Sequence, residues 1–337
     1  MAKTGVLLVN LGTPRSPNPA DVFTFLNEFL TDARVMDLPW LKRQCLVRGL
    51  IVPARYRQSA AQYKQLWTKE GSPIIVHGRA VQKELQNLLG SDFCIELAMR
   101  YQNPSIAHTL DLLQSQHLTN LIILPLFPQY ASATTGSVHQ CVMQYLKNWA
   151  VLPRLVFINE YCTHDGFINA FVERGKSYVQ DRYDHILFSF HGLPESHIEK
   201  ADSSKNCLKE GCCQKRSVSN FLCYKAQCNA TAQKIAEQLD LQASHYTICF
   251  QSRLGKKPWI RPYISEVLQQ CAARGDKRIL VFSPSFTCDC LETTCEIEIE
   301  YAHLFKEWGG KELKLVEGLN SHPSWIEALR CMILEQL

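Results

Sequence analysis

The stretch HILFSFHGLP, residues 185–194, decides the fold of this chain. Its first six residues are almost continuously apolar, which is typical of a β-strand that is covered on both faces in a parallel sheet. His191 ends this run, and Gly192 and Pro194 then turn the chain. The first half of the sequence repeats the arrangement, because residues 9–14 (VNLGTP) also carry an apolar strand into a turn that holds glycine and proline.

Short apolar runs alternate with longer helical patterns along the rest of the chain. The predicted strands cover residues 5–11, 95–100, 121–126, 155–159, 185–190, 246–251 and 278–282, and clear helical patterns cover residues 80–89 and 226–239. Such an alternation favours parallel sheets. A strand that ends in proline and an aromatic residue also occurs in each half, at residues 124–128 (LPLFP) and 282–286 (FSPSF). We therefore expect an α/β protein with two similar doubly wound, Rossmann-like domains, each with one parallel sheet.

The expected boundary between the two domains lies near residues 161–165. Residues 1–162 form the first domain, residues 163–322 form the second, and residues 323–337 form a helix that packs back on the body. Ligands of such folds bind at the carboxyl ends of the strands, so we expect the active-site cleft between the domains. A polar segment at about residues 195–228 interrupts the βα alternation, and we interpret it as a cysteine-rich insert in the second domain.

The composition excludes several classes of function. Of the 337 residues, 46% are apolar and 20% are charged, which is the profile of an ordinary globular protein. A net charge of +4 without a run of five lysines and arginines does not indicate a nucleic-acid partner. No apolar stretch is long enough to span a bilayer, and the short apolar run near the N-terminus is not a secretory signal. We expect a cytoplasmic protein with at most peripheral membrane contact.

His191 stands at the end of a predicted strand, beside a glycine that leaves room near the backbone. An imidazole in this place can accept a proton near neutral pH, or bind a divalent metal through a neutral ring nitrogen. A histidine that only caps the strand is the alternative. Position alone does not decide between these roles.

Three glutamates, Glu292, Glu296 and Glu300, recur at a spacing of four residues. On an α-helix they share one face, where their like charges repel one another. A solvated acidic stripe is the ordinary interpretation of such a row. However, Ile297 and Ile299 indicate burial on more than one side, and a buried row of carboxylates requires a cation. The sequence therefore predicts a metal path or a proton relay along this helix.

Cysteine is unusually abundant, with 15 residues in the chain. In a reducing compartment, clustered thiols indicate metal or iron–sulfur ligation more than disulfide bonds. Five of the cysteines fall in or directly after the polar part of the insert: Cys207, Cys212, Cys213, Cys223 and Cys228. The insert is therefore a second candidate for chemistry.

Nine motifs, in the right order and spread over essentially the whole chain, resemble the ferrochelatase family. They are residues 8–14 (LVNLGTP), 29–39 (FLTDARVMDLP), 71–73 (GSP), 98–103 (AMRYQN), 126–136 (LFPQYASATTG), 189–194 (SFHGLP), 224–230 (YKAQCNA), 251–259 (QSRLGKKPW) and 283–301 (SPSFTCDCLETTCEIEIEY). The resemblance implies a lyase that inserts Fe²⁺ into a porphyrin held between two Rossmann-like domains. Two protons are released in this reaction, which is the last step of haem biosynthesis.

The resemblance also implies roles for the histidine and the acidic row. His191 matches the family's active-site histidine, which accepts a pyrrole proton or ligates iron, and Glu292 matches the glutamate opposite it across the porphyrin. Glu296 and Glu300 match acidic residues that continue along a helix with a π-type irregularity. Asp289 is expected to belong to the same acidic relay.

Further candidates concern the porphyrin. Tyr130 matches a tyrosine of the family's pocket, and Ser132 and Thr135 are expected to help line the same loop. Arg100 and Arg253 are candidates for structural contacts or for binding the propionate carboxylates. A planar guanidinium suits a carboxylate because it binds with two parallel hydrogen bonds.

One position departs from the family pattern. Cys290 stands where a histidine is frequent, directly before the apolar residue of the LET motif, and Cys288 and Cys295 are nearby. A softer metal ligand and a small buried residue are the two interpretations of this cysteine.

Some ferrochelatases carry a [2Fe–2S] cluster, and in some bacterial members an internal cysteine-rich segment is thought to hold it. Four thiolates suffice for such a cluster. We expect Cys207, Cys212 and Cys213 as ligands, with either Cys228 or Cys223 as the fourth. A structural zinc site and a thiol-rich loop without metal are the alternatives.

The identity of the tetrapyrrole stays open at this point. We expect protoporphyrin IX as substrate, with coproporphyrin III and its four propionates as the alternative. A chelatase for another metal and a non-catalytic carrier of haem or iron are rival functions, although the carrier predicts loss of the pair His191 and Glu292, which is present. No nucleotide cofactor is expected, and the chain is expected to be a monomer or a homodimer.

Overall fold

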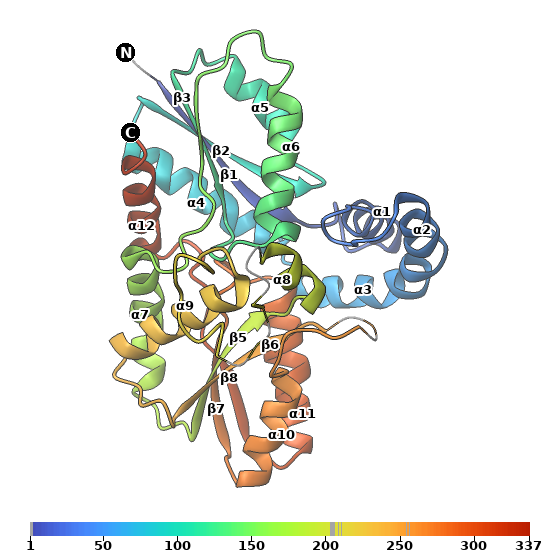
Figure 1. Ribbon diagram of the computed structural model, residues 1–337, viewed down its shortest axis with the longest axis vertical. Helices are drawn as coiled ribbons and strands as arrows, with labels where there is room; N and C mark the ends of the chain where they lie inside the picture. Colours follow the sequence, from blue (N-terminus) through green and yellow to red (C-terminus); the bar gives the residue numbers. More distant parts are fainter. Residues whose placement is uncertain (1–2, 203–205, 208, 210, 254, 256) are drawn as a thin grey trace. The chain divides into compact units, whose positions relative to one another are not determined.

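Two four-stranded parallel sheets carry the fold, one in each half of the chain (Figure 1). The computed structural model describes residues 3–202, 206–207, 209, 211–253, 255 and 257–337. The chain divides into two units. Unit 1 comprises Met1–Phe127, Ala131–Glu160 and Leu329–Leu337, and unit 2 comprises Pro128–Tyr130 and Tyr161–Ala328.

The sheet of unit 1 has the order β2–β1–β3–β4, with every neighbouring pair parallel. Its strands are β1 (Thr4–Gly12), β2 (Phe93–Tyr101), β3 (Asn120–Pro125) and β4 (Arg154–Phe157). The helices of this unit are α1 (Pro19–Leu30), α2 (Trp40–Leu46), the π-helix η1 (Val47–Ile51), α3 (Val52–Leu66), α4 (Pro73–Leu89), α5 (Ile106–Gln114), the π-helix η2 (Ser132–Gly136) and α6 (Ser137–Leu146).

Helices cover both faces of this first sheet. Leu110 of α5 and Val142 of α6 share a buried cluster with Ala98 of β2. The opposite face belongs to α4, where Gly78 lies so close to Leu97 that an added methyl group would be 2.9 Å from that side chain. Because Leu97 and Ala98 are consecutive in the strand, they point to opposite faces, and both faces are buried.

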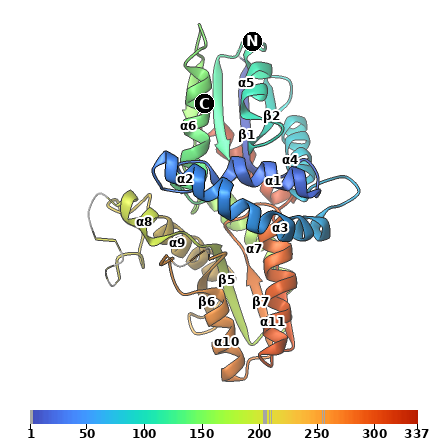
Figure 2. The same ribbon diagram turned by 90° about the vertical axis from the view of Figure 1, so that its right-hand side faces the viewer.

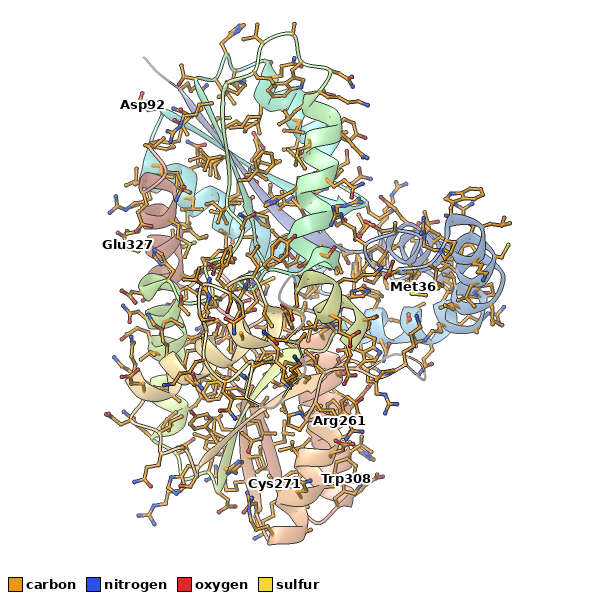
Figure 3. All side chains as sticks on the ribbon, in the orientation of Figure 1. Met36, Asp92, Arg261, Cys271, Trp308 and Glu327 are labelled. Carbon is orange, nitrogen blue, oxygen red and sulfur yellow. The ribbon has the colours of Figure 1, made fainter. Side chains whose placement is uncertain are left out.

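Helices α1 to α3 form a separate helical group within unit 1 (Figure 2). A small core of its own holds this group together, in which Leu30, Val47 and Val52 are buried and Met36 packs against them (Figure 3). Each of these helices also leaves a polar or exposed side, so the group is only partly buried.

The sheet of unit 2 repeats the same topology, with the order β6–β5–β7–β8 and parallel pairs throughout. Its strands are β5 (His185–His191), β6 (Tyr246–Gln251), β7 (Arg278–Phe282) and β8 (Glu312–Leu315). Its helices are α7 (Asp165–Val179), α8 (Glu195–Ala201), α9 (Tyr224–Gln238), α10 (Ile264–Arg274), the π-helix η3 (Leu291–Tyr301) and α11 (Ala302–Glu307), and α12 (Pro323–Leu334) follows.

Both faces of the second sheet are covered as well. Cys271 of α10 and Trp308, directly after α11, pack in one cluster with Leu187 of β5 (Figure 3). On the other face, Gly175 of α7 approaches Phe282 of β7 so closely that an added methyl group would lie 2.5 Å from the ring. Burial on both faces explains why the central strands β5 and β7 are nearly continuous apolar runs in the sequence.

The α/β class with two similar parallel sheets is confirmed, and all seven predicted strands are present. One strand, β8 (Glu312–Leu315), escaped prediction because it has only four residues and alternates polar with apolar side chains. The insert is not wholly irregular, since it begins with the short helix α8 and its last predicted residues belong to α9. Among the described residues, no helix combines the length and the apolar character that crossing a membrane would require.

Candidate active site

His191 is the last residue of β5, at the carboxyl edge of the second sheet. Its main-chain N–H donates to Ser285 Oγ at 3.0 Å, and its carbonyl oxygen accepts from Tyr224 OH at 2.7 Å. The rings of Trp259 and Phe286 lie 6.4 and 6.3 Å from the imidazole, centroid to centroid. The backbone of the histidine is therefore held at both its N–H and its carbonyl oxygen, and its ring has two aromatic neighbours.

The imidazole of His191 is held in one tautomer by the residue that follows it. Its Nδ1 lies 2.7 Å from the carbonyl oxygen of Gly192. Because a carbonyl oxygen can only accept, Nδ1 carries the hydrogen, and Nε2 is the acceptor nitrogen of the neutral ring. Within the described residues Nε2 has no hydrogen-bond partner. The ring thus offers one basic nitrogen for a proton or a metal.

The acidic row lies on η3, which continues directly into α11. The π-type irregularity implied by the family resemblance is confirmed and extends over eleven residues. Glu292 and Glu296 are half-buried, whereas Glu300 is exposed, so the row leads from the interior to solvent. Ile297 is fully buried as expected, but the expectation for Ile299 was wrong, because this residue is 46% exposed. The outer end of the helix therefore faces water.

Glu296 is held by residues at the end of β6. Its carboxylate accepts from the main-chain N–H of Ser252 at 2.8 Å and from the hydroxyl of Ser252 at 2.5 Å. The amide of Gln251 donates to the same carboxylate at 3.1 Å, and to the carbonyl oxygen of Glu292 at 2.8 Å. Burial raises the pKa of Glu296, while the hydrogen bonds from Ser252 and Gln251, and His191 whenever its ring is protonated, oppose this rise. The site thus keeps a half-buried carboxylate near the imidazole.

The carboxylate of Asp289 is occupied by hydrogen bonds from neighbouring residues of the protein. Its carboxylate accepts from the main-chain N–H of Gly318 at 3.1 Å and from the amide of Asn320 at 2.8 Å. Thr293 donates to Asp289 at 3.4 Å, and the N–H of Cys290 donates to the Thr293 hydroxyl at 2.9 Å. Cys290 is buried and caps the start of η3. This surrounding favours the interpretation of Cys290 as a small buried residue.

Tyr130 lies within the motif LFPQYASATTG, in the short segment Pro128–Tyr130 that belongs to unit 2. Its main-chain N–H donates to Gln227 Oε1 at 2.7 Å. The neighbouring Gln129 donates to Thr231 at 3.1 Å and to the carbonyl oxygen of Pro284 at 3.3 Å. The backbone of Tyr130 is therefore held by α9, and the side chain of the preceding Gln129 contacts both α9 and the turn after β7.

Two of the predicted porphyrin-lining residues, Ser132 and Thr135, lie on η2 in unit 1. Ser132 accepts a hydrogen bond from Nη1 of Arg34 at 2.9 Å. Thr135 is fully buried, and its hydroxyl finds no hydrogen-bond partner within the part of the chain that the structure describes. Their roles toward a substrate stay predictions.

Arg100, at the end of β2, takes part in a buried network of unit 1. Its Nη2 donates to Asp32 at 2.7 Å and its Nε donates to Ser137 at 2.7 Å. Asp32 also accepts from Tyr101 OH at 2.9 Å and from the N–H of Arg34 at 2.7 Å. Burial works to raise the pKa of Asp32, but the hydrogen bonds and the charge of Arg100 hold it below its usual value. Arg100 thus makes structural contacts with Asp32 and Ser137, which was one of the two roles expected for it.

Arg253 lies on the loop after β6, where two arginines stack on one aromatic ring. The guanidinium carbons of Arg253 and Arg261 lie 4.9 and 4.4 Å from the centroid of Tyr263 (Figure 3 labels Arg261). Arg261 is neutralised by Glu266 at 3.1 Å. Arg253 is exposed and, among the described residues, has no carboxylate partner. It is therefore the arginine of this pair that is open to an anion. Two residues of this QSRLGKKPW motif, Leu254 and Lys256, lie outside the described residues.

Three of the five candidate cysteines of the insert, Cys212, Cys213 and Cys223, lie close together. The sulfur atoms of Cys212 and Cys213 are 3.2 Å apart, and Cys213 is hydrogen-bonded to Cys223. This bond and the N–H groups at the start of α9 lower the pKa of Cys223 to about 6. Cys228 is fully buried on α9, and Cys207 is half-buried. Among the described residues, no three histidine, cysteine or acidic side chains are arranged to hold a metal ion.

The family model of ferrochelatase matches residues 3–337, nearly the whole chain. The chain belongs to the ferrochelatase family. A ferrochelatase of Legionella pneumophila (strain Corby) is 41% identical over 335 residues, with 99% of this chain and 100% of the relative covered. A ferrochelatase of Coxiella burnetii (strain Dugway 5J108-111) is 40% identical over 338 residues, with 99% of this chain and 94% of the relative covered.

Solved structures support the fold of this ferrochelatase family member. SirB from Bacillus subtilis with Fe³⁺ superimposes with a TM-score of 0.56 at 13% identity, with 99% of this chain and 95% of SirB covered. The sirohydrochlorin chelatase SirB from Bacillus subtilis subspecies spizizenii in complex with cobalt gives a TM-score of 0.57 at 12% identity, with coverages of 99% and 94%. The family and the enzyme class, a porphyrin metal chelatase of haem biosynthesis, are confirmed as the sequence predicted.

Several residues that hold this site together could not be predicted from the sequence. Tyr224, Ser285 and Gln251 lie within recognised motifs, but nothing in a single sequence tells which of their atoms reach His191 or the acidic row. A usable signal exists for Gln251, because a polar residue that ends an apolar parallel strand points to the ligand-binding edge of the sheet.

We expect Gly192→Ala to impair iron insertion. An added methyl group would lie 2.8 Å from the carbonyl oxygen of Gln251 and 3.2 Å from the ring of Trp259. Since that carbonyl is backbone, the turn must shift, and with it the acceptor that orients His191. Misplacement of this size costs about 100-fold in turnover, measured as the rate of porphyrin fluorescence loss with Fe²⁺.

Gly49→Ala is the matched control, because an added methyl group at Gly49 meets nothing within 4 Å. This control should keep the wild-type rate, with an unfolding temperature no lower than that of the wild type, because alanine is favoured over glycine within a helix. A Gly192→Ala protein that turns over at the wild-type rate would show that the turn does not position His191.

Proposed function

We propose that this protein inserts Fe²⁺ into protoporphyrin IX at the carboxyl edge of the second sheet, with His191 and Glu292 as catalytic residues. The observation that carries the proposal is the tautomer of His191, whose Nδ1 is tied to Gly192 and whose Nε2 is left as a base. Membership of the ferrochelatase family supplies the substrate class.

The chemistry of the reaction matches this arrangement. A porphyrin must release two N–H protons as iron enters, while the iron sheds bound water. His191 accepts one pyrrole proton at Nε2, which is the nitrogen that its hydrogen bond leaves basic. General base help of this kind is worth roughly 10²–10⁴-fold in rate.

The row of glutamates is assigned to guiding Fe²⁺ toward the porphyrin. Glu300 is exposed, while Glu296 and Glu292 are half-buried, so negative charge continues from solvent toward the site. A cation that loses water of hydration is stabilised by carboxylate oxygens at each step. We assign Glu292 to the reacting metal, Glu296 and Glu300 to the relay, and Asp289 to support of the helix start.

Binding of the porphyrin is assigned to Tyr130, Ser132, Thr135 and the arginines. Arg253 is the preferred partner of a propionate, because it lacks a carboxylate partner among the described residues whereas Arg100 is paired with Asp32. A guanidinium that also stacks on an aromatic ring is fixed in its plane, which suits two parallel hydrogen bonds to a carboxylate.

The test measures fluorescence loss of protoporphyrin IX with Fe²⁺ under anaerobic conditions. His191→Ala should lower the rate by about 10²–10⁴-fold, and Glu292→Gln should lower it strongly as well. His303→Ala is the control, because this histidine on α11 has a side chain that is 74% exposed and contacts Glu307.

A wild-type protein that leaves protoporphyrin metal-free would overturn the proposal. The same assay with coproporphyrin III decides between the two porphyrins, since the true substrate must give the higher kcat/KM. A wild type that converts only coproporphyrin would refute protoporphyrin as substrate while keeping the family assignment.

We further propose that the insert binds a [2Fe–2S] cluster through Cys207, Cys212, Cys213 and Cys223. The side chains of three of these residues already lie together, and Cys223 sits at the N-terminus of α9, where helix N–H groups favour a thiolate. Cys223 is preferred over Cys228, because the latter is fully buried beside Tyr224. When bound, such a cluster supplies a redox-sensitive cross-link of the insert.

Anaerobically purified protein should contain iron and acid-labile sulfide and absorb visible light. Cys213→Ser and Cys223→Ser should abolish both the colour and the sulfide, because each removes a ligand. Cys45→Ser, an exposed cysteine on α2, is the control and should leave both unchanged. A colourless wild type without sulfide would refute the cluster, and zinc in its place would identify a structural zinc site.

Peripheral membrane contact is proposed through the α2–η1 segment. Trp40, Leu41 and Leu50 are 67, 66 and 63% exposed, and the basic residues Lys42 and Arg48 lie exposed beside them. Apolar side chains flanked by positive charge fit the surface of an anionic bilayer.

Cosedimentation with vesicles should therefore require anionic phospholipid, and should be weak with phosphatidylcholine alone. The double substitution Trp40→Gln with Leu41→Gln should lower binding, whereas Val151→Gln should not, although Val151 is 81% exposed. A wild type that binds neither kind of vesicle would disprove the contact.

A further inference from the structure

Gln251 contacts both parts of the proposed site in unit 2, the turn after His191 and the acidic helix η3. It ends β6 and is the register partner of His191 on β5. The residue is only 2% exposed. Its main-chain carbonyl accepts from the N–H of Gly192 at 2.8 Å, so it holds the turn whose oxygen orients the imidazole.

The side-chain amide of Gln251 is fully used and has a defined orientation. Ser189 donates its hydroxyl to Oε1 at 2.8 Å, which identifies the other end of the amide as the donor. The two N–H bonds of Nε2 then go to the carbonyl oxygen of Glu292 at 2.8 Å and to the carboxylate of Glu296 at 3.1 Å. One side chain therefore connects β5, β6 and the acidic helix.

We propose that Gln251 is a positioning residue of iron insertion, which fixes the acidic helix relative to the imidazole of His191. The inference rests on the proposed function of this site. Through its main chain Gln251 sets the histidine turn, and through its amide it sets the first turn of η3 and the carboxylate of Glu296.

A neutral donor suits this place better than a cation. Lysine or arginine would also bind Glu296, but each would neutralise the charge that attracts Fe²⁺. An amide satisfies the half-buried carboxylate by hydrogen bonds and leaves its negative charge in place. The chemistry of the position thus favours glutamine, which positions without competing with the metal.

Two substitutions separate positioning from charge. Gln251→Met keeps the approximate size of the side chain and removes the amide, so we expect kcat to fall by about 10–100-fold with little change in porphyrin affinity. Gln251→Lys adds a competing cation, so we expect the KM for Fe²⁺ to rise by about tenfold. Steady-state kinetics with each substrate varied, together with porphyrin titration by absorbance, measure these effects.

Gln82→Met is the matched control. Gln82 of α4 in unit 1 makes the same pair of bonds, to the carbonyl oxygen of Ile95 at 2.9 Å and to the carboxylate of Glu96 at 3.1 Å. Its loss should lower the unfolding temperature without changing kcat or either KM.

A folded Gln251→Met protein with wild-type kcat would overturn the proposal, as would a loss of kcat that Gln82→Met reproduces. Should Gln251→Met fail to fold, Ser189→Ala takes its place, because it removes only the hydroxyl that orients the amide. Ser189→Ala must then lower kcat with unchanged porphyrin affinity. If wild type itself does not insert iron, the proposed function fails, which is distinct from failure of this inference.

Discussion

The main-chain hydrogen bond from Gly192 to Gln251 is the constraint on which the geometry around His191 depends. It continues the pairing of β5 with β6 by one residue beyond the strand. In the turn that follows, the carbonyl oxygen of Gly192 lies within hydrogen-bond distance of Nδ1 of His191. Because this oxygen can only accept, the imidazole carries its hydrogen on Nδ1. Glycine is required there, because any larger residue would meet the Gln251 carbonyl. Backbone geometry at one sheet edge thus decides which ring nitrogen is basic.

The half-buried carboxylates of the acidic helix η3 carry a desolvation cost, which hydrogen bonds must offset. Glu296 is stabilised by Ser252 and Gln251, and hydrogen bonds to a charged group are worth roughly 1.5–3 kcal/mol each. Even so, burial keeps the pKa of Glu296 raised. The carboxylate is therefore satisfied enough to stay in place, but still gains from an approaching cation. A π-helix serves this arrangement because its wider turn breaks the regular α-helical spacing at a functional site.

Much of the fold was predictable from the sequence, for a physical reason. Strands covered on both faces are apolar along most of their length, so apolar runs in the sequence identified seven of the eight strands in the described part of the chain. One of these seven, the edge strand β4, is only partly buried. The edge strand β8 is half-covered and short, and its alternation ELKL carries little signal. Ile299 was predicted to be buried because its side chain is apolar, but apolar residues also occur on protein surfaces. Its side of the helix η3 faces solvent.

The site was predictable only in part, because sequence identifies chemical groups but not their partners. His191 and the glutamate row stood out through residue type and spacing, whereas Tyr224 and Ser285 act through single hydrogen bonds to the backbone of His191. Such bonds join segments that are 33 and 94 residues apart, which no local pattern reveals.

The same bonds explain how a cysteine-rich insert can be accommodated beside the active site. The contacts that hold His191 come from Gly192, from Ser285 after β7 and from Tyr224 at the start of α9. All three lie outside the run of cysteines from Cys207 to Cys223, so none of these contacts comes from a cysteine of that run. Burial raises the pKa of the Tyr224 phenol and keeps it protonated as a donor. Because Cys223 directly precedes Tyr224, the last of the clustered cysteines adjoins the residue whose hydroxyl donates to the carbonyl oxygen of His191.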